Sequence, residues 1–124
     1  MSKELDIFGQ FIMKNLRDNA IDQFDGLARG HWKAPGLAKL QKDLTTFTPE
    51  QLAIIRRTVV ESIDTGVHDF LFSLQENLDL DNNIQIHVEG KNIAELSDGL
   101  HGELFTEDGW KAKYSVHGEA PEEA

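Results

Sequence analysis

Three residues between positions 61 and 68 have side chains that could do chemistry together. Glu61, Asp64 and His68 are spaced three and four residues apart, which places them on one face of a helix. Two carboxylates and an imidazole can bind a divalent transition metal or act as an acid–base pair. Chelation needs a further ligand from another element, and His87 or His101 could supply it. We favour the simpler interpretation of a solvated helix face, because the three residues lie opposite the apolar stripe of the same segment.

Other patterns of reactive residues lack the spacing that their chemistry needs. The five histidines form no helical zinc motif, and without cysteine the chain has no thiolate site, disulfide or cysteine nucleophile. No serine lies in a G-x-S-x-G motif, and no glycine-rich phosphate loop occurs. Residues 79–83 offer oxygens like a calcium loop, but Ile84 and Gly90 stand where that loop requires glycine and glutamate. The sequence therefore indicates no cofactor and no catalytic residue.

The charges are distributed unevenly along the chain. Residues 1–57 hold nine basic and seven acidic residues, a net charge of +2. Residues 58–124 hold three basic and fifteen acidic residues, a net charge of −12. A field of that sign repels nucleic acids and anionic membranes and attracts basic proteins or cations. We therefore expect a basic protein partner and no binding to nucleic acid or membrane, although an acidic surface can also serve solubility alone.

Eight acidic residues in the second half are candidates for binding such a partner. They are Glu61, Asp64, Asp69, Glu76, Glu95, Asp98, Glu103 and Asp108. Small immunity proteins, inhibitors and other accessory proteins of bacteria and phages work in this manner, and the sequence favours a non-enzymatic interaction protein of that type. Two alternatives remain open. One is a small metal-dependent enzyme that uses Glu61, Asp64 and His68, and the other is a homodimer that forms through the long helix described below.

The elements that position these residues begin with two helices. Apolar residues at steps of three or four predict a helix over residues 3–29, which Gly30 ends in a left-handed conformation. Its buried stripe is predicted to be Leu5, Phe8, Ile12, Leu16, Ala20, Phe24 and Leu27. A two-turn helix is predicted over residues 37–44. Between them, Trp32 is either an interface anchor or, as we favour, a plug at the end of the helical core.

A long helix follows. Thr48, Pro49 and Gln51 are the residue types of an N-cap, a first helical position and a capping box, so the helix begins at Pro49. Its predicted apolar stripe, Leu52, Ile55, Val59, Ile63, Val67, Phe70, Leu74 and Leu78, continues to about residue 78. Ile54 and Phe72 lie on the other side, and we expect them to belong to a second packing layer rather than an exposed patch. Gly66 suggests a close crossing or a kink.

Strands are predicted only near the C-terminus. Alternation over residues 84–89 is typical of a half-buried strand, and residues 92–98 fit a short helix or a second strand equally well. Residues 103–106 and 110–115 flank Glu107-Asp108-Gly109 and predict a β-hairpin. A small sheet cannot stand alone, so it should lie against the long helix. Its buried side chains would include Ile84, Ile86, Val88, Trp110 and Tyr114.

These elements predict one domain over residues 1–117. The fold class is α+β and predominantly helical, with a long central helix, two further N-terminal helices and a small C-terminal antiparallel sheet made of a hairpin and one more strand. Residues 118–124 are acidic and lack large apolar side chains, so we expect a disordered tail. We find no signal peptide and no apolar run of about 20 residues, which favours a cytoplasmic protein.

Overall fold

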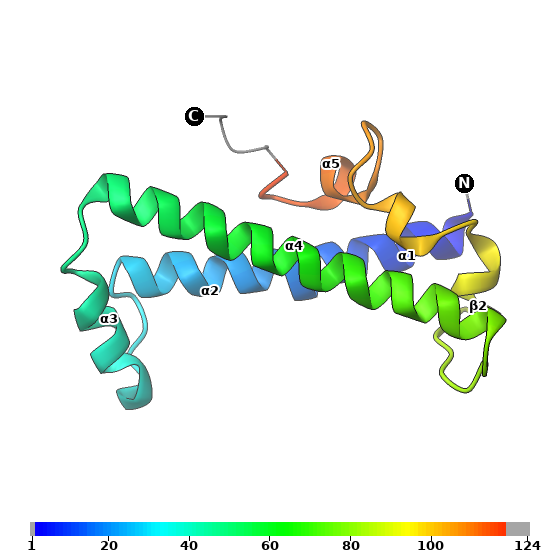
Figure 1. Cartoon of the computed structure of the whole chain (residues 1–124), viewed down its shortest axis with the longest axis horizontal. Helices are drawn as coiled ribbons and strands as arrows, with labels where there is room; N and C mark the ends of the chain where they lie inside the picture. Colours follow the sequence, from blue (N-terminus) through cyan, green and yellow to red (C-terminus); the bar gives the residue numbers. More distant parts are fainter. Residues whose placement is uncertain (1, 119–124) are drawn as a thin grey trace.

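Two long helical stretches lie side by side in the structure, a computed structural model that describes residues 2–118 (Figure 1). The first stretch consists of α1 (Lys3–Ile12), the π-helix η1 (Met13–Asp18) and α2 (Asn19–Ala28), and the second is α4 (Pro49–Asp79). The 3-10 turn η2 (Pro35–Leu37) and α3 (Ala38–Leu44) connect them. The predicted fold class is confirmed: the chain is mainly helical around a long helix and has a small antiparallel sheet.

The helix ends follow local chemistry that the sequence displays. Gly30 has φ +69°, and the amides of Gly30 and His31 donate to the carbonyls of Leu27 and Gly26, which is a Schellman motif. At the start of α4, the amide of Gln51 donates to the Thr48 hydroxyl (3.1 Å) and the amide of Thr48 donates to the Gln51 side chain (2.8 Å). The predicted left-handed stop and capping box are both confirmed.

The π-helix changes which residues of the first stretch are buried. Leu16 was expected in the buried stripe, but it is 44% exposed, while Met13 and Arg17 are buried. A π-turn holds one more residue than an α-turn, so the buried face passes from Ile12 to Met13 and from there to Arg17. The prediction for Leu16 was wrong because it assumed a constant helical period across the stretch.

The C-terminal third forms a short irregular layer on α1 and α4. It contains β1 (His87–Val88), β2 (Lys91–Asn92), η3 (Ile93–Leu96), η4 (Leu100–Glu103) and α5 (Trp110–Tyr114). The sheet is a two-residue hairpin in which His87 pairs with Asn92, and Glu89 and Gly90 make its turn with positive φ. The predicted strand over 84–89 is therefore confirmed only at its end. Residues 92–98 contain both the end of β2 and the 3-10 turn η3.

The predicted hairpin over residues 103–115 is wrong, because residues 110–114 form the helix α5. Trp110, Ala112 and Tyr114 alternate as in a strand, but Trp110 and Tyr114 are also four residues apart, the spacing of one helix face. Ala112 is exposed, which is consistent with the helix. Five residues are too few for the two periods to be distinguished from the sequence.

One core joins these elements. Its buried residues are Leu5, Phe8, Ile12, Met13, Val67, Leu71, Leu74, Ile93, Ala94, Leu100, Leu104 and Trp110. Trp110 lies so close to Gly9 of α1 that a Cβ there would stand 2.5 Å from the indole ring. Of the side chains predicted to be buried, Trp110 is enclosed and Ile86, Val88 and Tyr114 are partly buried, but Ile84 is 61% exposed because the strand does not extend to it.

Two predictions remain, one for the C-terminal tail and one for the lack of a membrane-spanning segment. Of the predicted tail over residues 118–124, only Gly118 is described, so the prediction for residues 119–124 lies outside the described residues. Between residues 2 and 118, no helix is long and apolar enough to cross a membrane.

Candidate functional site

The three residues that the sequence singles out line one cleft. Glu61, Asp64 and His68 project from the middle of α4 toward Phe105 and Lys111, and the cleft between them has a volume of about 320 Å³. The Lys111 ammonium lies 5.8 Å from the centre of the Phe105 ring. The predicted common face of the three residues is thus observed, and the segment that covers it is the one preceding and entering α5.

Asp64 differs from its two neighbours because a buried cation holds it. The Arg17 guanidinium of η1 donates to both Asp64 carboxylate oxygens, at 2.5 Å and 3.3 Å, and the Arg17 side chain is only 1% exposed. The same guanidinium donates to the Ser115 hydroxyl and the His117 carbonyl, each at 2.9 Å. Asp64 therefore points toward the core side of α4, not away from it, and its charge is already compensated.

A cluster of three rings lies beside the cleft, which one of them, His68, lines. His101 of η4 lies edge-on to His68 (5.2 Å between ring centres) and to Phe72 (4.9 Å), and His68 stacks on Phe72 at 6.5 Å. His68 Nδ1 lies 3.1 Å from Asp69 Oδ1. The Nδ1 atom of His101 is buried and has no hydrogen-bond partner among the described residues. Phe72 contacts the two histidine rings but is 42% exposed, and Ile54 is 54% exposed. The expected second packing layer over these two residues is therefore wrong, because the hairpin that was expected to cover them does not form.

His101 also lines a second hollow, formed by the loop after η3. This hollow measures about 640 Å³, and Ser97, Asp98 and Glu103 are among its lining residues. Gln75 of α4 fixes the loop, since its amide donates to the Ala94 carbonyl and its oxygen accepts from the Leu100 amide, both at 2.8 Å. The two hollows therefore lie on either side of the ring cluster. We call the face of α4 that carries Glu61, Asp64, His68, Asp69, Phe72 and Glu76, together with residues 95–111, the acidic seam.

Of the eight predicted partner-binding residues, Glu61 and Asp64 line the first hollow and Asp98 and Glu103 the second, whereas Asp69, Glu76, Glu95 and Asp108 line neither. Six are exposed: Glu61, Asp69, Glu76, Glu95, Asp98 and Asp108. Within residues 2–118, no lysine or arginine forms an ion pair with any of the six. The other two are engaged, Asp64 by Arg17 and Glu103 by the Ser97 hydroxyl at 2.7 Å. Of the exposed six, Asp69 lies 3.1 Å from His68 Nδ1, and the other five form no ion pair within residues 2–118.

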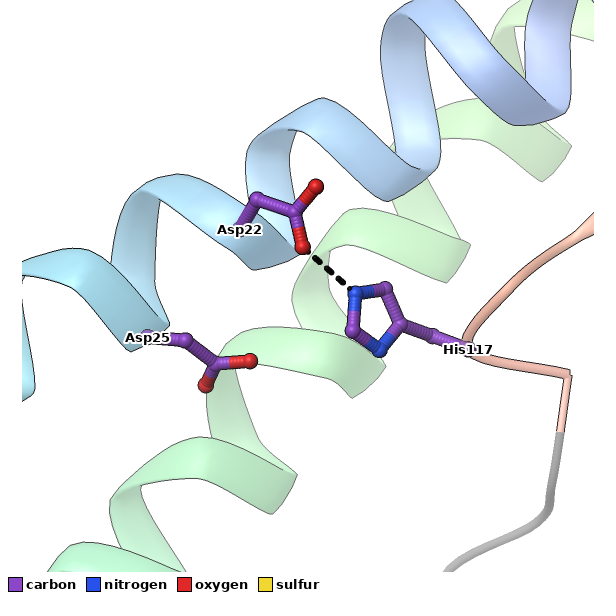
Figure 2. A group of neighbouring side chains, drawn as sticks. All are labelled: Asp22, Asp25 and His117. Atoms are coloured by element: carbon purple, nitrogen blue, oxygen red, sulfur yellow. Dashed lines mark hydrogen bonds and ion pairs between the residues drawn. The ribbon is translucent and has the colours of Figure 1, made fainter.

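A possible metal site lies elsewhere, between α2 and the C-terminal segment. Asp22, Asp25 and His117 place one ligand atom each within 4.8 Å of one another (Figure 2). Arg56 of α4 already donates to both oxygens of Asp25, at 2.8 Å and 3.0 Å, and lies 3.5 Å from His117 Nδ1, while His117 Nε2 lies 2.7 Å from Asp22. The hydrogen bonds from Arg56 hold the pKa of Asp25 below its ordinary value. The arrangement is explained as an ion-pair network that fixes the C-terminal segment.

This finding bears on the metal-enzyme alternative. No other group in residues 2–118 brings three candidate ligand atoms so close together, so Glu61, Asp64 and His68 do not form a preassembled metal site. Of the two histidines considered as a fourth ligand, His101 lies beside His68, whereas His87 lines a different hollow on the far flank of α4. The contact of Arg17 with Ser115 and His117 was not predicted from the sequence. About 100 positions of sequence separate Arg17 from the other two, so no local pattern indicates the contact.

Trp32 takes the simpler of its two expected roles. Its indole packs on Gly26 of α2 so closely that a Cβ there would overlap the ring, and it donates a hydrogen bond to the Gln23 carbonyl at 3.1 Å. It therefore closes the end of the helical core beside α3. Comparison of the chain with protein-family models, with curated proteins and with solved structures gives no match.

Proposed function

We propose that this chain is a small non-enzymatic interaction protein that binds a basic protein partner through the acidic seam. One observation supports this most directly: six exposed carboxylates lie on this surface without a lysine or arginine partner in residues 2–118. Such a surface attracts a basic protein over long range and accelerates its association.

The seam is also suited to hold a partner in one orientation. Gln75 fixes the 94–100 backbone on α4, so Glu95 and Asp98 are held on an anchored loop next to two hollows. Basic side chains that reach Glu61 or Asp98 can place their aliphatic parts against the His68, Phe72 and His101 rings. Protein interfaces commonly have aromatic side chains at the centre and polar side chains around them. The rings and the exposed carboxylates of the seam are the side-chain types that such an interface uses.

The test begins with affinity capture of partners from cells of the source organism, using the full chain as bait. The dissociation constant of each recovered protein is then measured with purified components at low and high salt. We expect Asp98→Lys to weaken binding about tenfold, because attraction becomes repulsion at one contact. Asp43→Lys on α3 changes the net charge equally and is the control, since Asp43 forms its ion pair with Lys39 of the same helix and lies outside the acidic seam.

Two outcomes contradict the proposal. One is that no basic protein is recovered. The other is that a recovered protein binds with a dissociation constant that neither salt nor Asp98→Lys changes, because a charge-based interface must respond to both.

The metal-dependent enzyme remains a rival because Glu61 and His68 do line one cleft. It requires Asp64 to leave Arg17 in order to bind a metal. Elemental analysis of the purified protein and of His68→Ala decides between the two functions. Stoichiometric metal in the wild-type protein that is lost in His68→Ala supports the enzyme. A metal-free protein whose melting temperature does not change when a chelator is added excludes this metal site.

A further inference from the structure

An apolar groove lies on the flank of α4 that faces away from the acidic seam. Phe70 follows His68 by two residues, which places it roughly 200° farther around the helix. The groove has a volume of about 570 Å³ and is lined by Ile7, Phe8, Phe11, Ile12, Asn15, Leu16, Phe70, Ile86, His87 and Val88. None of these is a lysine, arginine, aspartate or glutamate. We propose that this groove is the interface of a homodimer.

The groove has the shape that a two-fold contact needs. Phe11 is 62% exposed at its rim, and Ile7, Leu16 and Phe70 are between 38% and 46% exposed. The projecting ring and the hollow belong to the same surface, so a two-fold axis near Phe11 lets each copy insert its ring into the groove of the other. The volume of the groove is ample for one phenyl ring.

The exposed area is compatible with a dimer. From the exposed fractions, the four side chains present roughly 400 Å² per chain, the size of the largest apolar patch on an ordinary monomer. Two facing copies bury about twice that area, and the surrounding polar residues of α1 add to it, which brings the contact to the lower range of stable interfaces, about 1,200 Å².

The charge distribution indicates a second copy as the occupant. Each chain has a net charge of −10, so two copies repel one another wherever their acidic surfaces meet. The residues that line the groove carry no permanent charge, and the acidic seam lies on the other flank of α4. A basic partner gains nothing from an uncharged groove, whereas a second acidic copy can approach there at the lowest cost.

The experiment measures molar mass by light scattering over a wide range of protein concentration. We expect wild-type protein to shift from monomer to dimer as concentration rises, and added salt to strengthen the dimer because it screens the repulsion between the chains. Phe11→Glu should weaken the dimer at least tenfold. Ile54→Glu, at a 54% exposed site on the other flank of α4, should leave the dimer intact.

The outcomes separate this inference from the proposed function, whose complex weakens with salt. A wild-type chain that stays monomeric at every concentration and salt overturns the homodimer, as does a dimer that survives Phe11→Glu but is lost in Ile54→Glu. Circular dichroism checks that each variant is folded. If Phe11→Glu does not fold, Leu16→Gln takes its place, and slower amide exchange of residues 7–16 at high concentration gives the same information on the unmodified protein.

Discussion

Arg17 is a buried guanidinium that ties three parts of the chain together. It pairs with Asp64 of α4, lies 3.9 Å from Asp18, and donates to Ser115 and to the carbonyl of His117. Asp18 in turn accepts hydrogen bonds from the Ser115 hydroxyl and the Val116 amide. Because the guanidinium is buried, the loss of any of these partners would leave a charge without compensation, so the network favours this one arrangement of the three segments.

Removal of Arg17 is expected to be strongly destabilising. Arg17→Met leaves the buried Asp18 and the half-buried Asp64 without their cation, so the free energy of unfolding should fall by about 3 kcal/mol. Urea denaturation measures this loss. In the double variant with Asp64→Asn the loss should be smaller than the sum of the two single losses, because the partners interact directly. Arg57→Met, at an exposed site, is the control, and an Arg17→Met loss no larger than that of the control contradicts this role.

The pair of Asp25 and Arg56 gives stability a defined dependence on pH. Hydrogen bonds from Arg56 lower the folded-state pKa of Asp25 below 3.8, so the pair stabilises the fold above that pH. This contribution is lost as the pH falls through the lowered pKa. Asp25→Asn should therefore reduce the unfolding free energy by about 1 kcal/mol near neutral pH, a value that allows for the exposure of Arg56. The difference between variant and wild type should shrink as the pH falls through the lowered pKa of Asp25. A difference that does not change with pH would show that the charge of Asp25 is not its cause.

Among the helices and strands, the predictions that depend on neighbouring residues were confirmed, and those that missed a change of period along a segment were wrong. The capping box at Thr48 and the left-handed Gly30 depend on residues within five positions, so the sequence alone predicts them. The π-helix at residues 13–18 and the helix α5 depend on packing between distant segments. The first misplaced Leu16, and the second misplaced Ala112, which is exposed instead of sharing a face with Trp110 and Tyr114. Glu61 and His68 share a cleft as their spacing predicts, but the capture of Asp64 by Arg17 spans 47 positions of sequence and leaves no local pattern.

Replacement of two helical glycines by alanine should change the free energy of unfolding in opposite directions. A Cβ added to Gly66 of α4 would meet no atom within 4 Å outside its own helical turn, so of the two expected explanations, a close crossing or a kink, the close crossing is not found. Gly66→Ala should raise the unfolding free energy by about 1 kcal/mol through helix propensity. Gly9→Ala places a methyl group against the Trp110 ring and should lower the unfolding free energy by about 2 kcal/mol or more. Thermal denaturation checks both, and equal effects would contradict the difference in packing.

On the scale of the whole molecule, charge and apolar surface are separated by α4. The acidic seam and the apolar groove lie on opposite flanks of the same helix, so the two proposed complexes do not compete for one surface. We expect these two complexes to respond to salt in opposite directions, as described above. The long helix thus serves as a divider between two surfaces as well as the spine of the core.

The net charge of −10 predicts that salt stabilises the monomer. Raising the ionic strength from about 0.01 M to about 0.1 M shortens the Debye length from about 30 Å to about 10 Å and screens the repulsion among the unpaired carboxylates. The melting temperature at low protein concentration should rise by about 3 °C. Asp98→Lys, with a net charge of −8, should show a smaller rise. A melting temperature that falls with salt would mean that surface ion pairs outweigh the repulsion.

The placement of the two tryptophans has an optical consequence. Trp110 is enclosed in the core at the α1 end, and Trp32 covers the opposite end beside α3. Trp32→Phe leaves Trp110 as the sole strong emitter, with blue-shifted fluorescence that moves to longer wavelength only when the core around Gly9 comes apart. Comparison of that signal with wild-type fluorescence during denaturation reveals whether the two ends of this elongated helical pair melt together or in sequence.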